Sequence, residues 1–148
     1  MVSWHLTIDC TDPARLVEFW GPALGYVVPP PPDGQPTWND WYLSVGVPPE
    51  ELDLAGDGSD RLVDPAGAGP RIWFQVVSEA KTVKKRRHLD LYPGGGRQVP
   101  LAERIPRVEA KVTELVAAGA SIQHRHAADA DHYAVALHDP EGNEFCVA

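Results

Sequence analysis

The chain contains a similar strand-like segment twice, at residues 5–9 (HLTID) and at residues 88–92 (HLDLY). In each copy a histidine comes first, polar and apolar residues alternate, and a helical pattern follows along the chain. A second pair of similar segments, DPAG at residues 64–67 and DPEG at residues 139–142, follows later in each half. An internal repeat of this kind is typical of a supersecondary unit that stacks against its own copy. The repeat therefore favours a fold with two similar halves.

Each half predicts the same order of elements, which is a strand, a helix and then three strands. Thr11 or Asp12 can cap the helix of the first half, and Gly25 suits its end. In the second half the apolar residues from Val108 to Val116 recur at helical spacing. This order of elements predicts an α+β fold.

A chain of 148 residues is long enough to bury a core in one compact domain. We expect residues 1–148 to form that domain, with one βαβββ module at about 1–80 and a second at about 86–148. The two modules are expected to form a curved mixed sheet, with the helices outside and a concave cavity inside.

A proline-rich run and an aromatic insert interrupt the first half between residues 29 and 58. Trp38, Trp41 and Tyr42 are expected to lie on a short amphipathic helix that covers the sheet or lines the mouth of a pocket. We favour packing over ligand contact, because aromatic side chains bury a large area wherever they lie.

The net charge of −8 argues against broad binding to nucleic acid or to an acidic membrane, because either partner requires a basic face. No apolar run is long enough to span a bilayer, and Met1 leads directly into a strand pattern rather than into a signal peptide. Cys10 and Cys146 suggest no disulfide framework. We expect a cytoplasmic protein whose ligand is a small molecule.

The dense basic run at residues 81–87 is expected to be an exposed connector rather than an anion site. The second half also holds four further histidines, which are His124, His126, His132 and His138. The segment HRH followed by AADAD predicts the end of a strand and a loop. We expect surface histidines here, and an adventitious metal ion is the alternative.

Polar side chains of the predicted strands are expected to project from the face opposite the helices, because side chains alternate along a strand. The residues expected on this concave face are His5, Thr7, Asp9, Gln75, His88, Asp90, Glu144 and Cys146. Imidazole together with carboxylate suits a Zn, Fe, Mn or Ni ion. The alternative is that these polar groups satisfy one another through hydrogen bonds across the cavity.

Three segments resemble the vicinal oxygen chelate superfamily and, within it, the glyoxalase-like domain proteins, a group of glyoxalases, bleomycin-resistance proteins and dioxygenases. They are HLTIDCTDPARLVEFWGPALGY, the strand GPRIWFQVV with the KKRRHLDL that follows it, and the terminal DPEGNEFCV. Together they extend over nearly the whole chain. Members of this superfamily build a site in the concave sheet, commonly around a divalent metal held by the first and last strands of each half.

The resemblance implies a metal site at corresponding positions of this chain. His5 matches the first-strand ligand of the family, and His88 heads the equivalent strand of the second half. Similar chains usually have a glutamate seven residues after the Asp of the DPxG turn, where this chain has Cys146. The implied metal ligands are His5, His88 and Glu144, with Gln75 or Cys146 as a further ligand.

Two functions follow from the resemblance. The first is a metal-dependent lyase, isomerase or ring-cleaving dioxygenase that acts on a small organic molecule, with Asp90 as general base or as a hydrogen-bond partner of a metal ligand. The second is a metal-free binding protein similar to the drug-sequestering proteins of the bleomycin-resistance type. The residues expected to bind the substrate are Thr7, Asp9, Trp73, Gln75 and Cys146. The resemblance also implies a homodimer.

Overall fold

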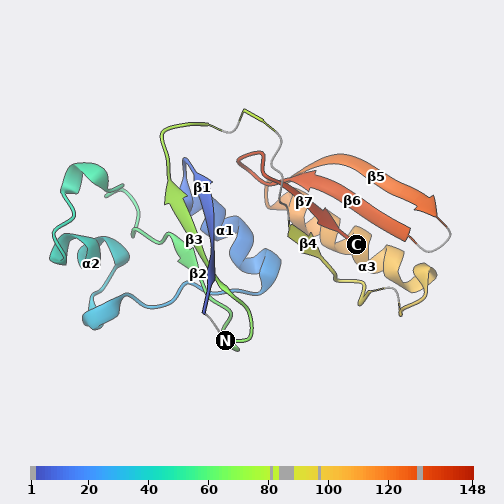
Figure 1. Cartoon of the computed structure of the whole chain (residues 1–148), viewed down its shortest axis with the longest axis horizontal. Coiled ribbons are helices and arrows are strands. Elements are labelled where there is room, and N and C mark those ends of the chain that lie inside the picture. Colours follow the sequence, from blue (N-terminus) through green and yellow to red (C-terminus); the bar gives the residue numbers. More distant parts are fainter. Residues whose placement is uncertain (1–2, 81, 84–88, 97, 130–131) are drawn as a thin grey trace. The chain divides into compact units, whose positions relative to one another are not determined.

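The protein has a mixed α+β fold, in agreement with the fold class predicted from the sequence (Figure 1). Contacts divide the chain into two compact units, Met1–Ala80 and Lys81–Ala148, and each unit has its own small sheet. The computed structural model describes residues 3–80, 82–83, 89–96, 98–129 and 132–148. Of the basic run at residues 81–87, Thr82 and Val83 are described, and both are exposed.

The first unit contains three strands and two α-helices. These elements are β1 (His5–Cys10), α1 (Pro13–Leu24), α2 (Trp38–Ser44), β2 (Arg61–Leu62) and β3 (Arg71–Val76), with short 3-10 turns at Pro32–Gly34 and Pro49–Glu51. The strand order is β1-β3-β2, in which β1 runs parallel and β2 antiparallel to β3. Where a further strand was expected after α1, Val27 forms an isolated antiparallel bridge with Val63.

Helix α1 covers one face of the first sheet. Its start is capped by Asp12, whose Oδ1 accepts a hydrogen bond of 3.1 Å from the backbone N–H of Arg15. It ends at Gly25, which has the left-handed φ of 70° that suits glycine. Leu16 on the helix and Phe74 on β3 are both fully buried. The apolar side of the sheet therefore faces the helix, and its other side is left to polar residues.

The second unit has the predicted order of strand, helix and three strands. Its elements are β4 (Leu89–Leu91), α3 (Leu101–Ala117), β5 (Ser121–Asp129), β6 (His132–His138) and β7 (Glu144–Val147). The strand order is β4-β7-β6-β5, and only the β4–β7 pair among these described strands is parallel. Val108 and Leu115 of α3 pack with Val135 and Phe145 in a core from which water is excluded.

Helix α3 begins seven residues before Val108, where the apolar pattern starts, and Pro106 lies inside it. The earlier turns were not evident from apolar spacing because a charged residue occupies the buried position there. Arg104 is only 4% exposed, and its Nε donates a hydrogen bond of 2.9 Å to the carbonyl of Val99. A long side chain whose stem is buried in this way does not register in a hydrophobic pattern.

The two DPxG segments form the same turn in both units. Asp64 accepts hydrogen bonds from the backbone N–H groups of Ala66, Ala68 and Gly69, and these bonds lower the pKa of its carboxyl group. Asp139 likewise accepts from the backbone N–H groups of two residues of its own turn, at 2.9 Å each. The structure therefore repeats at the level of turn chemistry as well as sequence.

None of the helices in the described part of the chain is both long enough and apolar enough to cross a membrane.

Candidate functional site on the polar faces of the two sheets

The face of the first sheet that is turned away from α1 carries polar and aromatic side chains. Along β3, Ile72 and Phe74 are buried toward the helix, whereas Trp73 between them is 37% exposed. The register places Thr7 opposite Trp73 and Asp9 opposite Gln75. His5, Thr7 and Asp9 are all exposed. The structure thus brings together, on one face, the residues that the sequence predicted there for the first half.

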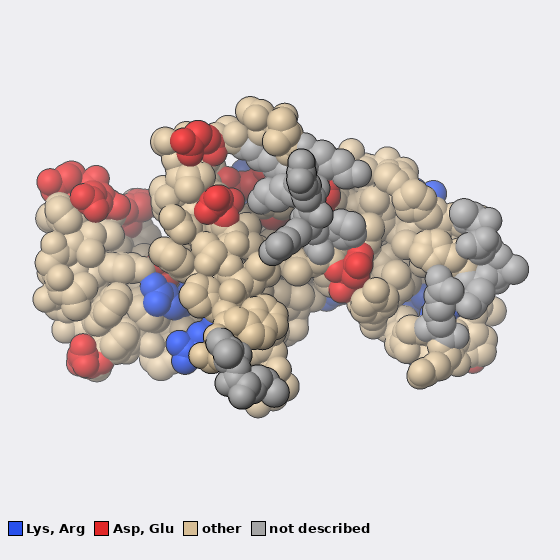
Figure 2. All heavy atoms as spheres, in the orientation of Figure 1, with Lys and Arg blue, Asp and Glu red and all other residues tan. Residues whose placement is uncertain are grey.

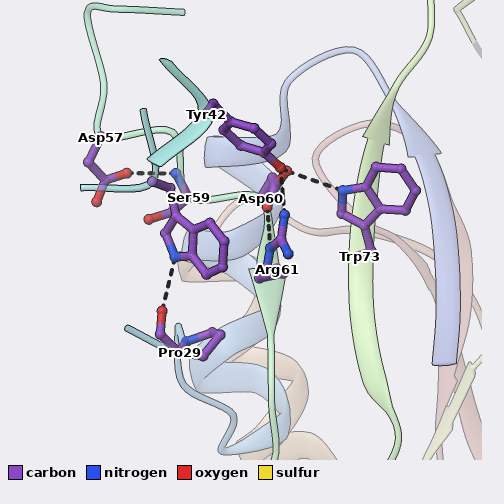
Figure 3. Close-up of polar contacts among 8 residues, drawn as sticks. Pro29, Tyr42, Asp57, Ser59, Asp60, Arg61 and Trp73 are labelled. Atoms are coloured by element: carbon purple, nitrogen blue, oxygen red, sulfur yellow. Dashed lines mark hydrogen bonds and ion pairs between the residues drawn. The ribbon is translucent and has the colours of Figure 1, made fainter. Parts of the chain in front are cut away.

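A carboxylate beside this face accepts hydrogen bonds from three side chains (Figure 3). Asp60 Oδ2 accepts a hydrogen bond of 2.5 Å from the hydroxyl of Tyr42 and one of 3.1 Å from the indole Nε1 of Trp73. Asp60 Oδ1 accepts a charge-assisted bond of 2.7 Å from Arg61 Nε. We call Tyr42, Asp60, Arg61 and Trp73 the Asp60 cluster. Because one side chain comes from α2 and one from β3, the cluster fastens the insert to the sheet.

Electrostatics keep the phenol of this cluster neutral. Partial burial, followed by the hydrogen bond and negative charge of Asp60, raises the pKa of Tyr42 to about 12. Its hydroxyl therefore donates to Asp60 at neutral pH and accepts a 2.5 Å hydrogen bond from the guanidinium of Arg61. The cluster is an ordered, charge-balanced frame that fixes the ring of Trp73.

The aromatic insert packs in the way that the sequence analysis favoured. Trp38 is buried, its Nε1 donates 2.9 Å to the carbonyl of Pro29, and the guanidinium of Arg61 lies 3.9 Å from the centre of its ring. Asn39 donates to the carbonyls of Asp53 and Gly56 at 2.9 Å each. These contacts order the backbone and side chains of the insert. The insert therefore forms an ordered segment beside the polar face of the first sheet.

Acidic side chains gather on the surface at the turn that follows α2, as Figure 2 shows. The exposed acidic residues of this segment are Glu50, Glu51, Asp53 and Asp57. The potential at this end of the first unit is therefore negative, which disfavours the approach of a polyanion.

The second sheet has a polar face of its own, turned away from α3. Asp90 on β4 lies opposite Cys146 on β7, and Cys146 lies opposite Ala136 on β6. A cavity of about 360 Å³ opens beside these strands. Its lining consists of Asp90, Tyr92, Gly96, Arg104, His126, His132, Tyr133, Ala134, Cys146 and Ala148. The cavity therefore combines a carboxylate, a thiol, imidazoles and phenols with small side chains.

The three predicted metal ligands lie in different parts of the chain. His5 is exposed on the polar face of the first sheet, and Glu144 begins β7 in the second unit. Glu144 Oε1 lies 3.9 Å from Nε2 of His138, its cross-strand partner. His88 lies outside the described residues. Among the side chains that are described, no group of three or more His, Cys, Asp or Glu residues is close enough to hold a metal ion.

Several cavity and cluster residues were not predicted from the sequence. Asp60 and Arg61 were missed because they lie immediately before and at the start of the two-residue strand β2, which is too short for alternation to assign a face. Arg104 was missed because it is a charged residue in a helix. A usable signal existed for His126, which alternates with Arg125 along β5 and so shares the face of the cavity.

A sequence model of the glyoxalase-like domain matches residues 5–148. The chain belongs to the glyoxalase-like domain family. Solved structures agree with the fold of this glyoxalase-like domain. This chain is 17% identical to a glyoxalase/bleomycin resistance protein/dioxygenase family enzyme from Burkholderia phytofirmans. The TM-score is 0.56, and the match covers 97% of this chain and 94% of the other. No curated protein sequence matches this chain significantly.

Two further structures share the fold of the glyoxalase-like domain. A possible glyoxalase from Bacillus cereus is 15% identical, with a TM-score of 0.58 and coverage of 99% of this chain and 97% of the other. A mutant of the fosfomycin resistance protein FosX from Listeria monocytogenes, in complex with Mn(II) and 1S,2S-dihydroxypropylphosphonic acid, is 10% identical. Its TM-score is 0.55, and coverage is 99% of this chain and 90% of the other.

Proposed function

We propose that this glyoxalase-like domain binds a small organic molecule on the polar faces of its sheets. The observation that carries the proposal is the cavity beside β4 and β7, whose volume of about 360 Å³ is in the usual range for small-molecule sites. Asp90 and Cys146 lie side by side in its lining, as the predicted polar face requires. Small side chains such as Ala134 leave room for a ligand.

The groups around the cavity suit a ligand that carries both hydrogen-bond donors and acceptors. The carboxylate of Asp90 accepts hydrogen bonds, while Tyr92 and His132 can donate them. In the first unit, the indole of Trp73 is held by Asp60 and offers an aromatic surface next to Thr7. A polar molecule fits the cavity of the second unit, and a planar group fits the indole surface of the first unit.

We further propose that the protein catalyses a metal-assisted lyase, isomerase or dioxygenase reaction. His5, His88 and Glu144 would hold the ion, and their imidazole and carboxylate groups are suitable donors for Zn, Fe, Ni or Mn. A divalent metal bound there would polarise a carbonyl or hydroxyl oxygen of the substrate. The Mn(II) complex of the FosX neighbour supports this choice of metal class.

Asp90 is the proposed general base of such a reaction. Its carboxylate lies in the cavity lining and opposite Cys146, so it can accept a proton from a bound molecule. Glu144 Oε1 lies 3.9 Å from Nε2 of His138. In the metal-bound protein we propose that this carboxylate binds the ion in place of that contact.

The alternative proposal is a binding protein that requires no metal. The Asp60 cluster favours it, because a tryptophan fixed by a charge-balanced frame is a preorganised stacking surface rather than a reactive group. In that case Thr7, Asp9 and Gln75 supply hydrogen bonds beside the indole.

Elemental analysis of protein purified without chelator and without a metal-binding tag tests the metal-assisted reaction. We expect one equivalent of divalent metal that is lost from the double variant His5→Ala and His88→Ala. Absence of metal after reconstitution with Zn, Ni, Fe and Mn would establish the binding protein instead. A thermal-shift screen of small acids, phosphonates and aromatic compounds tests ligand binding itself, with Asp90→Asn and Trp73→Ala as the variants that distinguish the two faces.

We also propose that the protein acts in the cytoplasm as a homodimer, because an isologous two-fold contact is the commonest closed symmetry. Sedimentation at micromolar concentration is the test, and a species of 16.1 kDa alone would contradict the dimer.

A further inference from the structure

Two histidines outside the family-type metal positions direct their ring nitrogens at each other. His124 and His126 lie two residues apart on β5, so their side chains leave the strand on the same face. Their Nε2 atoms are in contact, their ring centres are 4.0 Å apart, and the ring planes are inclined by 80°. We propose that His124 and His126 form a binding site for a transition-metal ion such as Cu²⁺, Ni²⁺ or Zn²⁺.

The strand opposite makes room for this arrangement. His124 lies across from Ala136 and His126 across from Ala134, so small side chains stand where larger ones would push the rings apart. Both histidines are exposed. An ion can therefore reach the pair from solvent, and the rings can adjust to it.

The two nitrogens lie closer together than a shared ion requires. Zinc binds imidazole nitrogen at about 2.0 to 2.1 Å, so two nitrogens on one tetrahedral ion are roughly 3.3 Å apart. The Nε2 atoms of His124 and His126 are directed at each other and in contact, so the two exposed rings would have to move apart for both nitrogens to bind one ion. Neutral imidazole is also a preferred ligand of zinc, copper and nickel.

Arg125 lies between the two histidines in the sequence, but its positive charge does not disfavour the binding of a cation to them. Arg125 projects to the other face of the sheet, where its Nε and Nη2 bind the carboxylate of Glu109 at 2.9 and 3.0 Å. Its charge is therefore neutralised on the side of α3. The net charge of −8 adds a general attraction for cations.

The site would leave coordination positions open. His126 belongs to the lining of the 360 Å³ cavity, together with His132, Asp90 and Cys146. The described residues supply two imidazoles to the ion, and water or an oxygen of a molecule in the cavity fills the remaining positions. The metal site thus lies at the edge of the proposed ligand site and uses neither His5 nor Glu144 as a ligand.

Equilibrium dialysis of the full, tag-free chain against Cu²⁺ and Zn²⁺ tests the proposal. We expect one ion per chain that depends on this pair, with Cu²⁺ bound more tightly than Zn²⁺. His124→Ala and His126→Ala should each weaken its binding by about tenfold or more, because one of two ligands is lost. His138→Ala, on the same polar face, is the matched control and should retain the ion.

Electron paramagnetic resonance of the Cu²⁺ form gives an independent readout, because two coordinated imidazoles produce nitrogen splitting that each single variant reduces. Unchanged affinity in His124→Ala or His126→Ala would overturn the proposal and leave a hydrogen bond between the rings as their role. An equal loss in His138→Ala, or dependence on His5, would also overturn it. Binding only at millimolar Cu²⁺ would show an adventitious ion only.

Discussion

Tyr42 and Asp60 are joined by a hydrogen bond of 2.5 Å between the phenol hydroxyl and Oδ2, although 18 residues separate them in the chain. The same oxygen accepts the indole N–H of Trp73, which belongs to β3. A single carboxylate therefore connects helix α2 to the polar face of the first sheet. Changes at Asp60 should alter both the stability of the insert and the position of Trp73.

Replacing Asp60 by Ala should destabilise the protein by about 1–3 kcal/mol, because it leaves the partly buried donors of Tyr42, Arg61 and Trp73 without their acceptor. Tyr42→Phe removes only the hydroxyl and should cost about 0.5–1.5 kcal/mol. Urea unfolding followed by tryptophan fluorescence measures both. Asp53→Asn is the control, since Asp53 is exposed and should change stability by less than about 0.5 kcal/mol. Equal stability of Asp60→Ala and the wild type would show that the cluster does not hold the insert.

The ionisation of Tyr42 should appear as a late step in alkaline titration. Its pKa is raised from 10.0 to about 12 in the folded protein, so folding favours its neutral form. The stabilisation from this shift is complete below pH 10 and is lost as the pH rises through about 12. The ultraviolet difference between wild type and Tyr42→Phe isolates this phenol. Asp60→Asn should move its ionisation to lower pH, and no movement would contradict the role assigned to Asp60.

A thiol reagent should modify Cys146 before Cys10. Cys146 lines the cavity, whereas Cys10 is 3% exposed at the end of β1. Mass spectrometry of the native protein should show one fast adduct that disappears in Cys146→Ser and a second adduct only after unfolding. A ligand that occupies the cavity should slow the first reaction. Modification of both thiols at the same rate would mean that the cavity is not the accessible route.

The choice between Glu144 and Cys146 as metal ligand can be made with two single variants. Glu144→Ala should remove the divalent metal at the family-type site without unfolding the protein, because its side chain is partly exposed. Cys146→Ser should then retain most of the metal. If the two variants exchange behaviour, and the Co²⁺ form shows a thiolate charge-transfer band, Cys146 is the ligand. Metal content unchanged in both variants would remove this strand from the site.

Alternation along the strands made much of the fold and of both polar faces predictable. Trp73 and Gln75 share a face because Ile72 and Phe74 fill the core, and this pattern is visible in the sequence. The repeated DPxG turns were predictable for the same kind of reason, since each depends on residues within a few positions of its aspartate.

The long-range polar contacts were not predictable in this way. Tyr42 contacts Asp60 only because the whole insert folds back on the sheet. No periodic pattern in the sequence around either residue predicts this contact. The pairing of His124 with His126 depends on the alanines of the neighbouring strand as well as on their own spacing. Register between strands fixes such neighbours, and one sequence without a structure does not specify it.

The turn held by Asp139 fixes the length of the loop between β6 and β7. Its carboxylate also accepts a 2.7 Å hydrogen bond from the side chain of Asn143, and β7 begins at the next residue. One residue added or removed there would exchange the two sides of the strand, so that Phe145 would enter the cavity and Cys146 the core. Single-residue insertions and deletions in this loop are therefore incompatible with the site even where Asp139 and Asn143 are kept.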